Sequence, residues 1–104
     1  MSSEASLQKI IQLVGHSVIK HTGKTKYTRK VFNNKTIVII YFSAGYCGPC
    51  RRFSPKLKQY YMTMQEEKQS IEIIMIGLNK TKHNFRQYFN SMPWYAAPYN
   101  PNKD

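Results

Sequence analysis

Hydrophobic residues along the chain follow two spacings, one typical of amphipathic helices and one typical of buried strands. Apolar side chains recur three and four positions apart over residues 4–14, and this period predicts a helix. The same spacing predicts helices over 48–68 and 82–91. Residues 36–44 and 71–78 contain unbroken runs of β-branched and other apolar residues, which predict central strands buried on both faces of a sheet.

The remaining segments carry weaker patterns. Residues 17–20 form a short β-branched run, and residues 25–32 alternate imperfectly, which predicts a weak strand or a loop. Pro55 falls inside the predicted helix over 48–68 and should kink it. The tail from Met92 onward holds three of the five prolines and is predicted to be extended.

Together these elements predict an α/β fold. Their order is helix, strand, strand, helix, strand, helix. Two buried strands joined by a crossover helix form a β-α-β unit, whose strands are parallel and need helices on both faces. Four aromatic residues at helical spacing are expected in the core, namely Tyr60, Tyr61, Phe85 and Phe89.

The length of 104 residues fits a single domain over residues 1–104 with one modest core. No apolar run is long enough for a transmembrane helix, and the first residues resemble neither a secretory signal nor an Arg-rich transit peptide. Two cysteines are too few for the disulfide scaffold of a small secreted domain. We therefore expect a cytoplasmic protein, with the nucleus as the alternative compartment.

The chain is strongly basic, with 16 Lys and Arg against 5 Asp and Glu and a formal net charge of +11. This charge favours anionic partners such as acidic proteins, nucleic acid or lipid headgroups, although a solvated basic surface would also account for it. The basic residues fall into three groups: residues 20–35; Arg51, Arg52, Lys56 and Lys58; and Lys80, Lys82 and Arg86. Tyr27 and Phe32 lie in the first group, where they could stack on bases. No RNA- or DNA-binding motif accompanies them, so nucleic acid is not the favoured partner.

The segment Cys47-Gly48-Pro49-Cys50 has the clearest chemical meaning in the sequence. Because it lies between a predicted strand and a predicted helix, Cys47 stands at a helix N-terminus, where free backbone N–H groups and the helix dipole lower the pKa of a thiol. Pro49 suits the first turn, since its missing N–H costs nothing there. Cys50 lies one turn further in, close enough to attack a mixed disulfide at Cys47, and Arg51 adds positive charge near the thiolate. The pattern indicates a nucleophilic thiol paired with a resolving thiol.

Three other interpretations of the two cysteines stay open at this point. A C-x-x-C pair can be half of a zinc site, which His16 and His21 would have to complete because no second C-x-x-C pair exists. The cysteines could instead be two buried structural residues, or the motif could be accidental. The Gly-Pro pair and the strand-to-helix context argue against these last two interpretations. We expect neither a metal nor a cofactor.

The segment YFSAGYCGPCRRFSP resembles the active-site segment of the thioredoxin superfamily, and within it the tryparedoxin and nucleoredoxin branch. The branch pattern YFSA-x-W-C-x-P-C-R-x-F-x-P is met by Tyr41 to Ala44, Cys47, Pro49, Cys50, Arg51, Phe53 and Pro55. A second stretch is similar to the branch pattern F-x-x-YF-x-x-MPW-x-A-x-P, with matches at Phe85, Tyr88, Phe89, Met92, Pro93, Trp94, Ala96 and Pro98. The resemblance covers roughly residues 13–100.

The resemblance implies a thioredoxin-like three-layer sandwich and reduction of protein disulfides through the CGPC dithiol. Cys47 would be the nucleophile and Cys50 the resolving thiol, supported by Tyr46, Pro49 and Arg51 together with the glycine between the cysteines. The implied partners are disulfide-containing proteins and an upstream dithiol reductant. The basic groups on either side of the motif would steer acidic substrates toward it.

The sequence departs from the family pattern at three places. Tyr46 replaces the Trp that precedes the first cysteine in this branch. Tyr41 stands where thioredoxins often have a buried Asp, so no carboxylate base is visible there. Residues 79–83 are basic, whereas the corresponding stretch is acidic in many relatives.

The sequence ends at Asp104, before the cis-proline loop, two further strands and last helix of the family fold. We therefore expect a fold truncated after the helix that follows the second buried strand, with an open sheet edge and uncovered apolar surface. A homodimer or a completing partner would cover that surface. Short forms in the nucleoredoxin-like branch are associated with signalling, so a redox-inactive or signalling half-domain that binds a protein partner is the alternative function. A third possibility is a dimer whose thiols bridge a metal or an iron–sulfur cluster.

Overall fold

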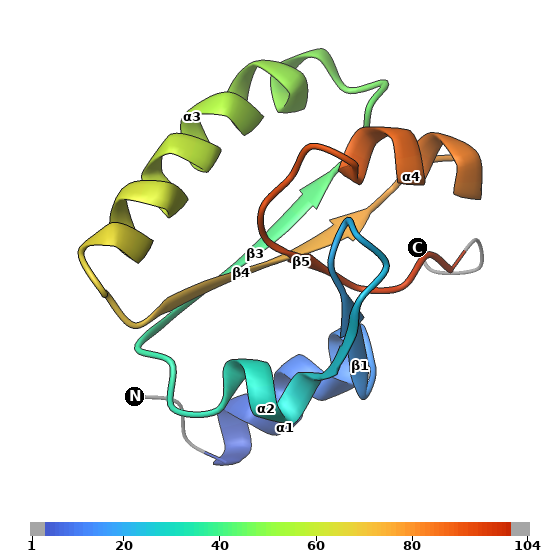
Figure 1. Ribbon diagram of the computed structural model, residues 1–104. Helices are drawn as coiled ribbons and strands as arrows, with labels where there is room; N and C mark the ends of the chain where they lie inside the picture. The colour runs from blue at the N-terminus through green and yellow to red at the C-terminus, as the bar shows by residue number, and fades with distance from the viewer. Residues whose placement is uncertain (1–3, 101–104) are drawn as a thin grey trace.

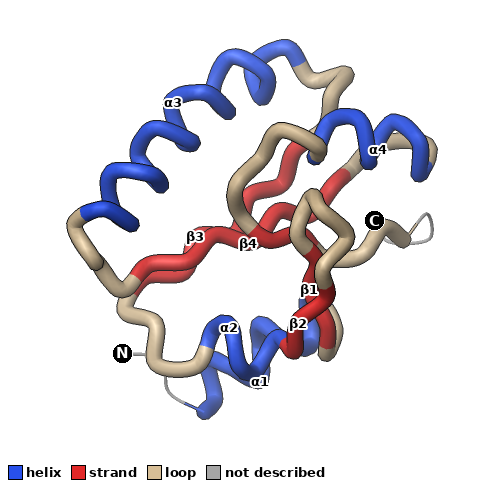
Figure 2. The backbone as a smooth tube through the Cα atoms, viewed as in Figure 1, coloured by secondary structure: helices blue, strands red, loops and turns tan. Residues whose placement is uncertain are grey.

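The computed structural model describes residues 4–100, which form a five-stranded sheet with helices on both faces (Figures 1 and 2). The strand order is β2-β1-β5-β4-β3. The elements are α1 (Glu4–Val14), β1 (Ser17–Ile19), β2 (Thr25–Tyr27), α2 (Thr28–Phe32), β3 (Ile37–Ser43), α3 (Gly48–Glu66), β4 (Ile71–Gly77), α4 (Lys82–Phe89) and β5 (Tyr95–Ala96). The predicted α/β class is confirmed.

The β3-α3-β4 unit forms the half of the sheet that leads into the cysteine motif. β3 and β4 are parallel and in register from Ile37 opposite Ile71 to Ser43 opposite Gly77. A Cβ atom added at Gly77 would lie 2.6 Å from a ring carbon of Phe85, so the glycine lets α4 pack closely against the end of β4. The parallel unit predicted from the two apolar runs is confirmed.

Two clusters of buried side chains lie on the two faces of the sheet. α1 and α2 cover one face, and α3 and α4 cover the other (Figures 1 and 2). In α1 the predicted apolar stripe is buried, with Leu7, Ile10, Ile11 and Val14. The other cluster surrounds Trp94, which is fully buried. Removing several such side chains from water stabilises the fold by about 1.5–3 kcal/mol each.

The tail was predicted only to be extended, but it contributes a strand to the sheet. β5 lies between β4 and β1, parallel to the first and antiparallel to the second. Its residues Tyr95 and Ala96 are buried. The tail therefore completes the middle of the sheet, which its prolines had not suggested.

β3 is not buried on both faces, and this prediction was wrong. β3 is the edge strand of the sheet among residues 4–100, and the exposed fractions of Ile37, Ile40 and Phe42 are 42%, 38% and 50%. Ile40 and Phe42 lie on the same face of the sheet as α1 and α2. These helices cover that face over β4 but not over the end of β3. β4, in contrast, is buried from Ile71 to Ile76 as predicted.

Several element boundaries also differ from those predicted. Residues 25–32 form a short strand followed by a short helix rather than one weak strand or loop. α3 and α4 each end two residues earlier than predicted. α3 continues through Pro55. Tyr60 is exposed and was wrongly expected in the core, whereas Tyr61, Phe85 and Phe89 are buried as expected.

No helix within residues 4–100 has the length and apolar character needed to cross a membrane.

Candidate active site at the Cys47–Cys50 pair

The cysteine motif lies where β3 turns into α3. The turn is held by two backbone hydrogen bonds, one from Leu78 N–H to the Ser43 carbonyl at 2.9 Å and one from Cys47 N–H to the Ala44 carbonyl at 3.1 Å. Cys47 is the N-cap residue of α3, with extended backbone angles, and Pro49 lies in the first turn. The local sequence therefore places the first cysteine at the helix N-terminus, as predicted.

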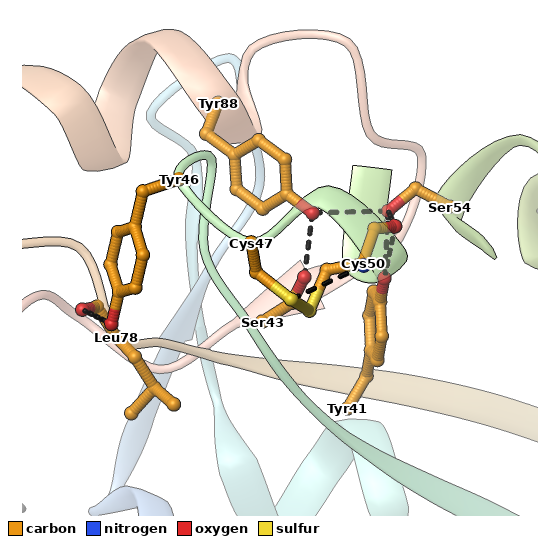
Figure 3. The surroundings of a disulfide bond; sticks show 8 residues. All are labelled: Tyr41, Ser43, Tyr46, Cys47, Cys50, Ser54, Leu78 and Tyr88. Carbon is orange, nitrogen blue, oxygen red and sulfur yellow. Dashed lines mark hydrogen bonds between the residues drawn. A yellow bond between two sulfur atoms is a disulfide. The ribbon is translucent and has the colours of Figure 1, made fainter. Parts of the chain in front are cut away.

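The two cysteines form a disulfide with their Cα atoms 5.2 Å apart, and both are half-buried (Figure 3). The Cys50 backbone N–H donates to the Cys47 sulfur at 3.2 Å. When the disulfide is reduced, a thiolate at Cys47 would have this N–H and the positive end of the α3 dipole beside it. The geometry can therefore stabilise a negative sulfur through the helix N-terminus.

Four hydroxyl groups form a connected network beside the disulfide (Figure 3). The Tyr88 hydroxyl lies 2.6 Å from the Ser43 hydroxyl and 3.1 Å from the Ser54 hydroxyl. Ser54 in turn lies 2.7 Å from the Tyr41 hydroxyl. Both hydroxyls lie within hydrogen-bond distance of the Cys50 carbonyl, Ser54 at 3.0 Å and Tyr41 at 3.1 Å, and the carbonyl accepts from this pair. The network fastens the first turn of α3 to β3 and α4.

The Tyr88 hydroxyl lies at the centre of this network. Burial raises the pKa of Tyr88 above its usual value, and the hydrogen bonds with Ser43 and Ser54 offset this only in part. Tyr41 occupies the position at which sequence analysis found no carboxylate, and its hydroxyl holds the Cys50 carbonyl instead. Tyr41, Ser43 and Tyr88 were identified from the sequence only as motif residues, and Ser54 was missed. Ser54 follows Cys50 by one helical turn, and that spacing is the signal that would have identified it.

Tyr46 lies on the other side of the disulfide and is 65% exposed. Its hydroxyl donates to the Leu78 carbonyl at 3.2 Å (Figure 3). The Lys80 ammonium lies 5.8 Å from the centre of the Tyr46 ring. This tyrosine thus presents an aromatic surface next to Cys47, tied to the loop after β4.

The other predicted site residues lie in the first turn of α3. The space around Gly48 is open: a Cβ atom added there would have one neighbour within 4 Å, an Arg52 guanidinium nitrogen at 3.4 Å. Pro49 and Arg51 are exposed, and the Arg51 N–H donates to the Cys47 carbonyl at 3.0 Å. The structure therefore gathers all six predicted site residues around one turn.

The zinc alternative finds no support within one chain. Across residues 4–100, no three His, Cys, Asp or Glu side chains are placed to share a metal ion. His16 and His21 therefore do not complete a site with the two cysteines.

The sequence of this chain is similar to those of known proteins. Residues 34–104 match a protein-family model described as Thioredoxin-like. The chain is 37% identical to Probable nucleoredoxin 3 from Oryza sativa subsp. japonica over 90 residues, which are 86% of this chain and 19% of that protein. It is 42% identical to nucleoredoxin from Homo sapiens over 60 residues, which are 58% of this chain and 14% of that protein.

Solved structures give the same result at the level of the fold. Native tryparedoxin I from Crithidia fasciculata matches with a TM-score of 0.77 and 29% identity, over 89% of this chain and 61% of that chain. Thioredoxin from Wuchereria bancrofti matches with a TM-score of 0.76 and 29% identity, over 86% of this chain and 62% of that chain. The chain thus spans less than a fifth of the nucleoredoxins and about three-fifths of the solved proteins. Since motif, sheet and relatives agree, the chain belongs to the thioredoxin-like family, in the tryparedoxin and nucleoredoxin branch of the thioredoxin superfamily.

Proposed function

We propose that residues 1–104 form one thioredoxin-like domain that reduces protein disulfides through the CGPC dithiol. The observation that supports this most directly is the position of Cys47, which caps α3 and accepts the Cys50 N–H on its sulfur. A sulfur in that position is stabilised as a thiolate, the nucleophilic form of cysteine. Cys50 is bonded to it in the structure, so it is close enough to resolve an intermediate.

The exchange proceeds in two displacements. The Cys47 thiolate attacks one sulfur of the substrate disulfide, forming a mixed disulfide and releasing the other substrate sulfur, which takes up a proton. The Cys50 thiol then loses its proton and attacks the Cys47 sulfur, forming the Cys47–Cys50 disulfide and releasing the second substrate thiol. Two electrons pass from the CGPC dithiol to the substrate. An upstream dithiol returns them in the same manner and restores the starting state.

The hydroxyl network and the first turn of α3 would keep Cys50 in position during the second displacement. The Cys50 carbonyl accepts from the hydrogen-bonded pair of Ser54 and Tyr41 hydroxyls, which fixes the backbone of that residue. Tyr46, Gly48, Pro49 and Arg51 act as supporting residues around Cys47. The proposal uses no cofactor and no metal. It suits the cytoplasm, or the nucleus, where thiols are kept reduced.

Reduction of insulin by the purified chain with dithiothreitol as the electron source tests this function. We expect the wild-type chain to accelerate precipitation of the insulin B chain, and both Cys47→Ser and Cys50→Ser to abolish the acceleration. Retention of most of the activity in either variant would contradict a dithiol mechanism.

A second candidate function is favoured by the exposed edge of β3. Among residues 4–100, β3 pairs only with β4, and Ile40 and Phe42 are exposed beside its free edge. Such an edge is a template for an added strand. The chain would then act as a redox-inactive or signalling domain that binds a protein partner. This alternative predicts that the wild type does not reduce insulin. It also predicts that Phe42→Lys loses binding to the partner, whereas the variant without both cysteines keeps full binding.

A further inference from the structure

Two cavities adjoin the cysteine motif on either side of Tyr88. The first cavity has a volume of about 440 Å³, and Tyr46, in the turn before Cys47, lines one side of it. Lys80 and residues of α4 line the other side. Because Tyr46 precedes Cys47 directly, this cavity lies where a substrate bound to that sulfur would continue.

The second cavity has a volume of about 310 Å³ and lies between α3 and the segment after α4. Ser54 and Lys58 line it from α3, and Trp94 lines it from the tail. Arg51 and Tyr88 line both cavities, so the two cavities adjoin along one groove. We call this the Tyr88 groove, formed by the linings of the two cavities.

The charged side chains of the Tyr88 groove all carry the same sign. They are Arg51, Lys58 and Lys80, and no Asp or Glu lines either cavity. No carboxylate among residues 4–100 pairs with any of these three residues, since the ion pair in that part of the chain joins Arg29 to Glu4. Most of the other polar lining is amide and hydroxyl, from Asn, Gln, Ser and Tyr side chains. The groove is therefore complementary to a carboxylate-bearing ligand.

We propose that the Tyr88 groove binds an acidic peptide segment that flanks the disulfide attacked by Cys47, an inference that rests on the exchange reaction proposed above. Two adjoining cavities suit an extended segment of several residues, which advances about 3.3 Å per residue. Each exposed ion pair stabilises the complex only slightly. Three like charges along the groove act mainly on the association rate, and salt weakens that effect.

The test uses two disulfide-linked peptides that differ only in their flanking residues, four Glu in one and four Lys in the other. We expect kcat/KM at low salt to be about tenfold higher for the Glu peptide, and the ratio to approach one in high salt. Equal rates for the two peptides at low salt would overturn the proposal.

A charge-reversal pair locates the effect. In Lys58→Glu/Lys80→Glu the preference for the Glu peptide should disappear or reverse. The matched control Lys9→Glu/Lys26→Glu changes the net charge equally at exposed positions that line neither cavity, and it should keep most of the preference. An equal loss in both variants would show that net charge, and not the groove, selects the substrate.

Two small disulfides separate the possible failures. Neutral hydroxyethyl disulfide should be reduced at similar rates by the wild type and the control Lys9→Glu/Lys26→Glu, and no reduction by either would refute the exchange reaction itself. Glutathione disulfide carries carboxylates but cannot fill two cavities as a longer peptide does. If its kcat/KM equals that of the Glu peptide and falls as much in Lys58→Glu/Lys80→Glu, the groove serves a small acidic thiol and the peptide assignment is wrong.

Discussion

Cys47 ends the turn after β3 and caps α3, and in the proposed exchange reaction it also carries the nucleophilic sulfur. The Cys50 N–H that satisfies the helix end also points at this sulfur, at 3.2 Å. In the proposed reaction, helix capping and thiolate stabilisation use the same hydrogen bond, so a residue that caps the helix without a sulfur should keep the fold and lose the exchange reaction. A serine at this position is therefore a conservative structural replacement.

The first prediction at this scale concerns the acidity of Cys47. In a Cys50→Ser variant, where only one thiol titrates, we expect the Cys47 pKa to fall below the free-thiol value of about 8.5, because of the helix N-terminus and the nearby Arg51. Ultraviolet absorbance of the thiolate against pH measures it. Arg51→Gln should raise the midpoint, and a midpoint at or above the free value in the parent variant would contradict the geometry.

The second residue-scale prediction concerns Glu4. Its carboxylate accepts hydrogen bonds from the Arg29 guanidinium at 3.0 Å and 2.9 Å and from Gln8 at 2.9 Å. The Arg29 and Gln8 hydrogen bonds lower the pKa of Glu4 from 4.5 to about 2. A lowered folded-state pKa means that the contribution to stability is present above pH 4.5 and is lost as the pH falls toward 2. Titration by NMR should show this midpoint in the wild type and a higher midpoint, closer to 4.5, in Arg29→Gln, where the Gln8 hydrogen bond remains. The same midpoint in both would contradict the pairing.

At the scale of elements, α3 is fastened to the sheet by polar contacts at both ends of its buried face. The hydroxyl network holds its first turn. Toward its other end, the Tyr61 hydroxyl donates at 2.7 Å to Glu72, a buried carboxylate on β4 that also accepts the Ile73 N–H at 3.1 Å. Burial and the nearby Glu72 carboxylate raise the pKa of Tyr61, so the donor keeps its proton over the working pH range.

Tyr61→Phe tests this contact. The variant leaves the buried Glu72 without its side-chain donor, and we expect the free energy of unfolding to fall by about 1–3 kcal/mol. Urea unfolding followed by the fluorescence of Trp94, the single tryptophan, measures it. Tyr60→Phe, an exposed neighbour on the same helix, should change stability by less than about 0.5 kcal/mol. Equal effects of the two variants would show that the buried contact contributes nothing.

The sequence predicted those elements whose pattern reflects their surroundings directly. The stripe from Leu7 to Val14 and the position of Cys47 at a helix start were both found in the structure. The unbroken apolar run of β3 gave the strand but not its place in the sheet, because such a run does not distinguish an edge strand from a central one. β5 was missed as a strand because pairing of two residues depends on β1 and β4, not on local sequence. The serine–tyrosine network joins residues up to 45 positions apart, which no local pattern reveals.

At the scale of the whole molecule, an excess of positive charge coexists with an apolar edge strand that pairs on one side only among residues 4–100. The net charge of +11 favours separation of copies of the chain, whereas the free edge of β3 is a template for pairing with a further strand. β3 carries no charged residue and no proline from Ile37 to Ser43, so it lacks two of the features that commonly protect an edge strand.

We therefore predict marginal stability and self-association through β3. The weight-average mass from sedimentation should rise with protein concentration, and more steeply when salt screens the charge. Ile40→Lys, which places a charge beside the edge, should keep the chain monomeric. Met62→Lys, a similar change at an exposed position of α3, should behave like the wild type. A sharply unfolding monomer at every concentration would show that the described fold is self-sufficient.

The central claim is the division of work between the two cysteines, and trapping of the mixed disulfide tests it most directly. Each single-cysteine variant is incubated with an oxidised protein substrate and the adducts are identified by mass spectrometry of the intact complex and its peptides. Cys50→Ser should accumulate a mixed disulfide through Cys47, because the resolving thiol is gone. Cys47→Ser should accumulate none. Equal trapping by both variants, or trapping through Cys50 alone, would contradict the account.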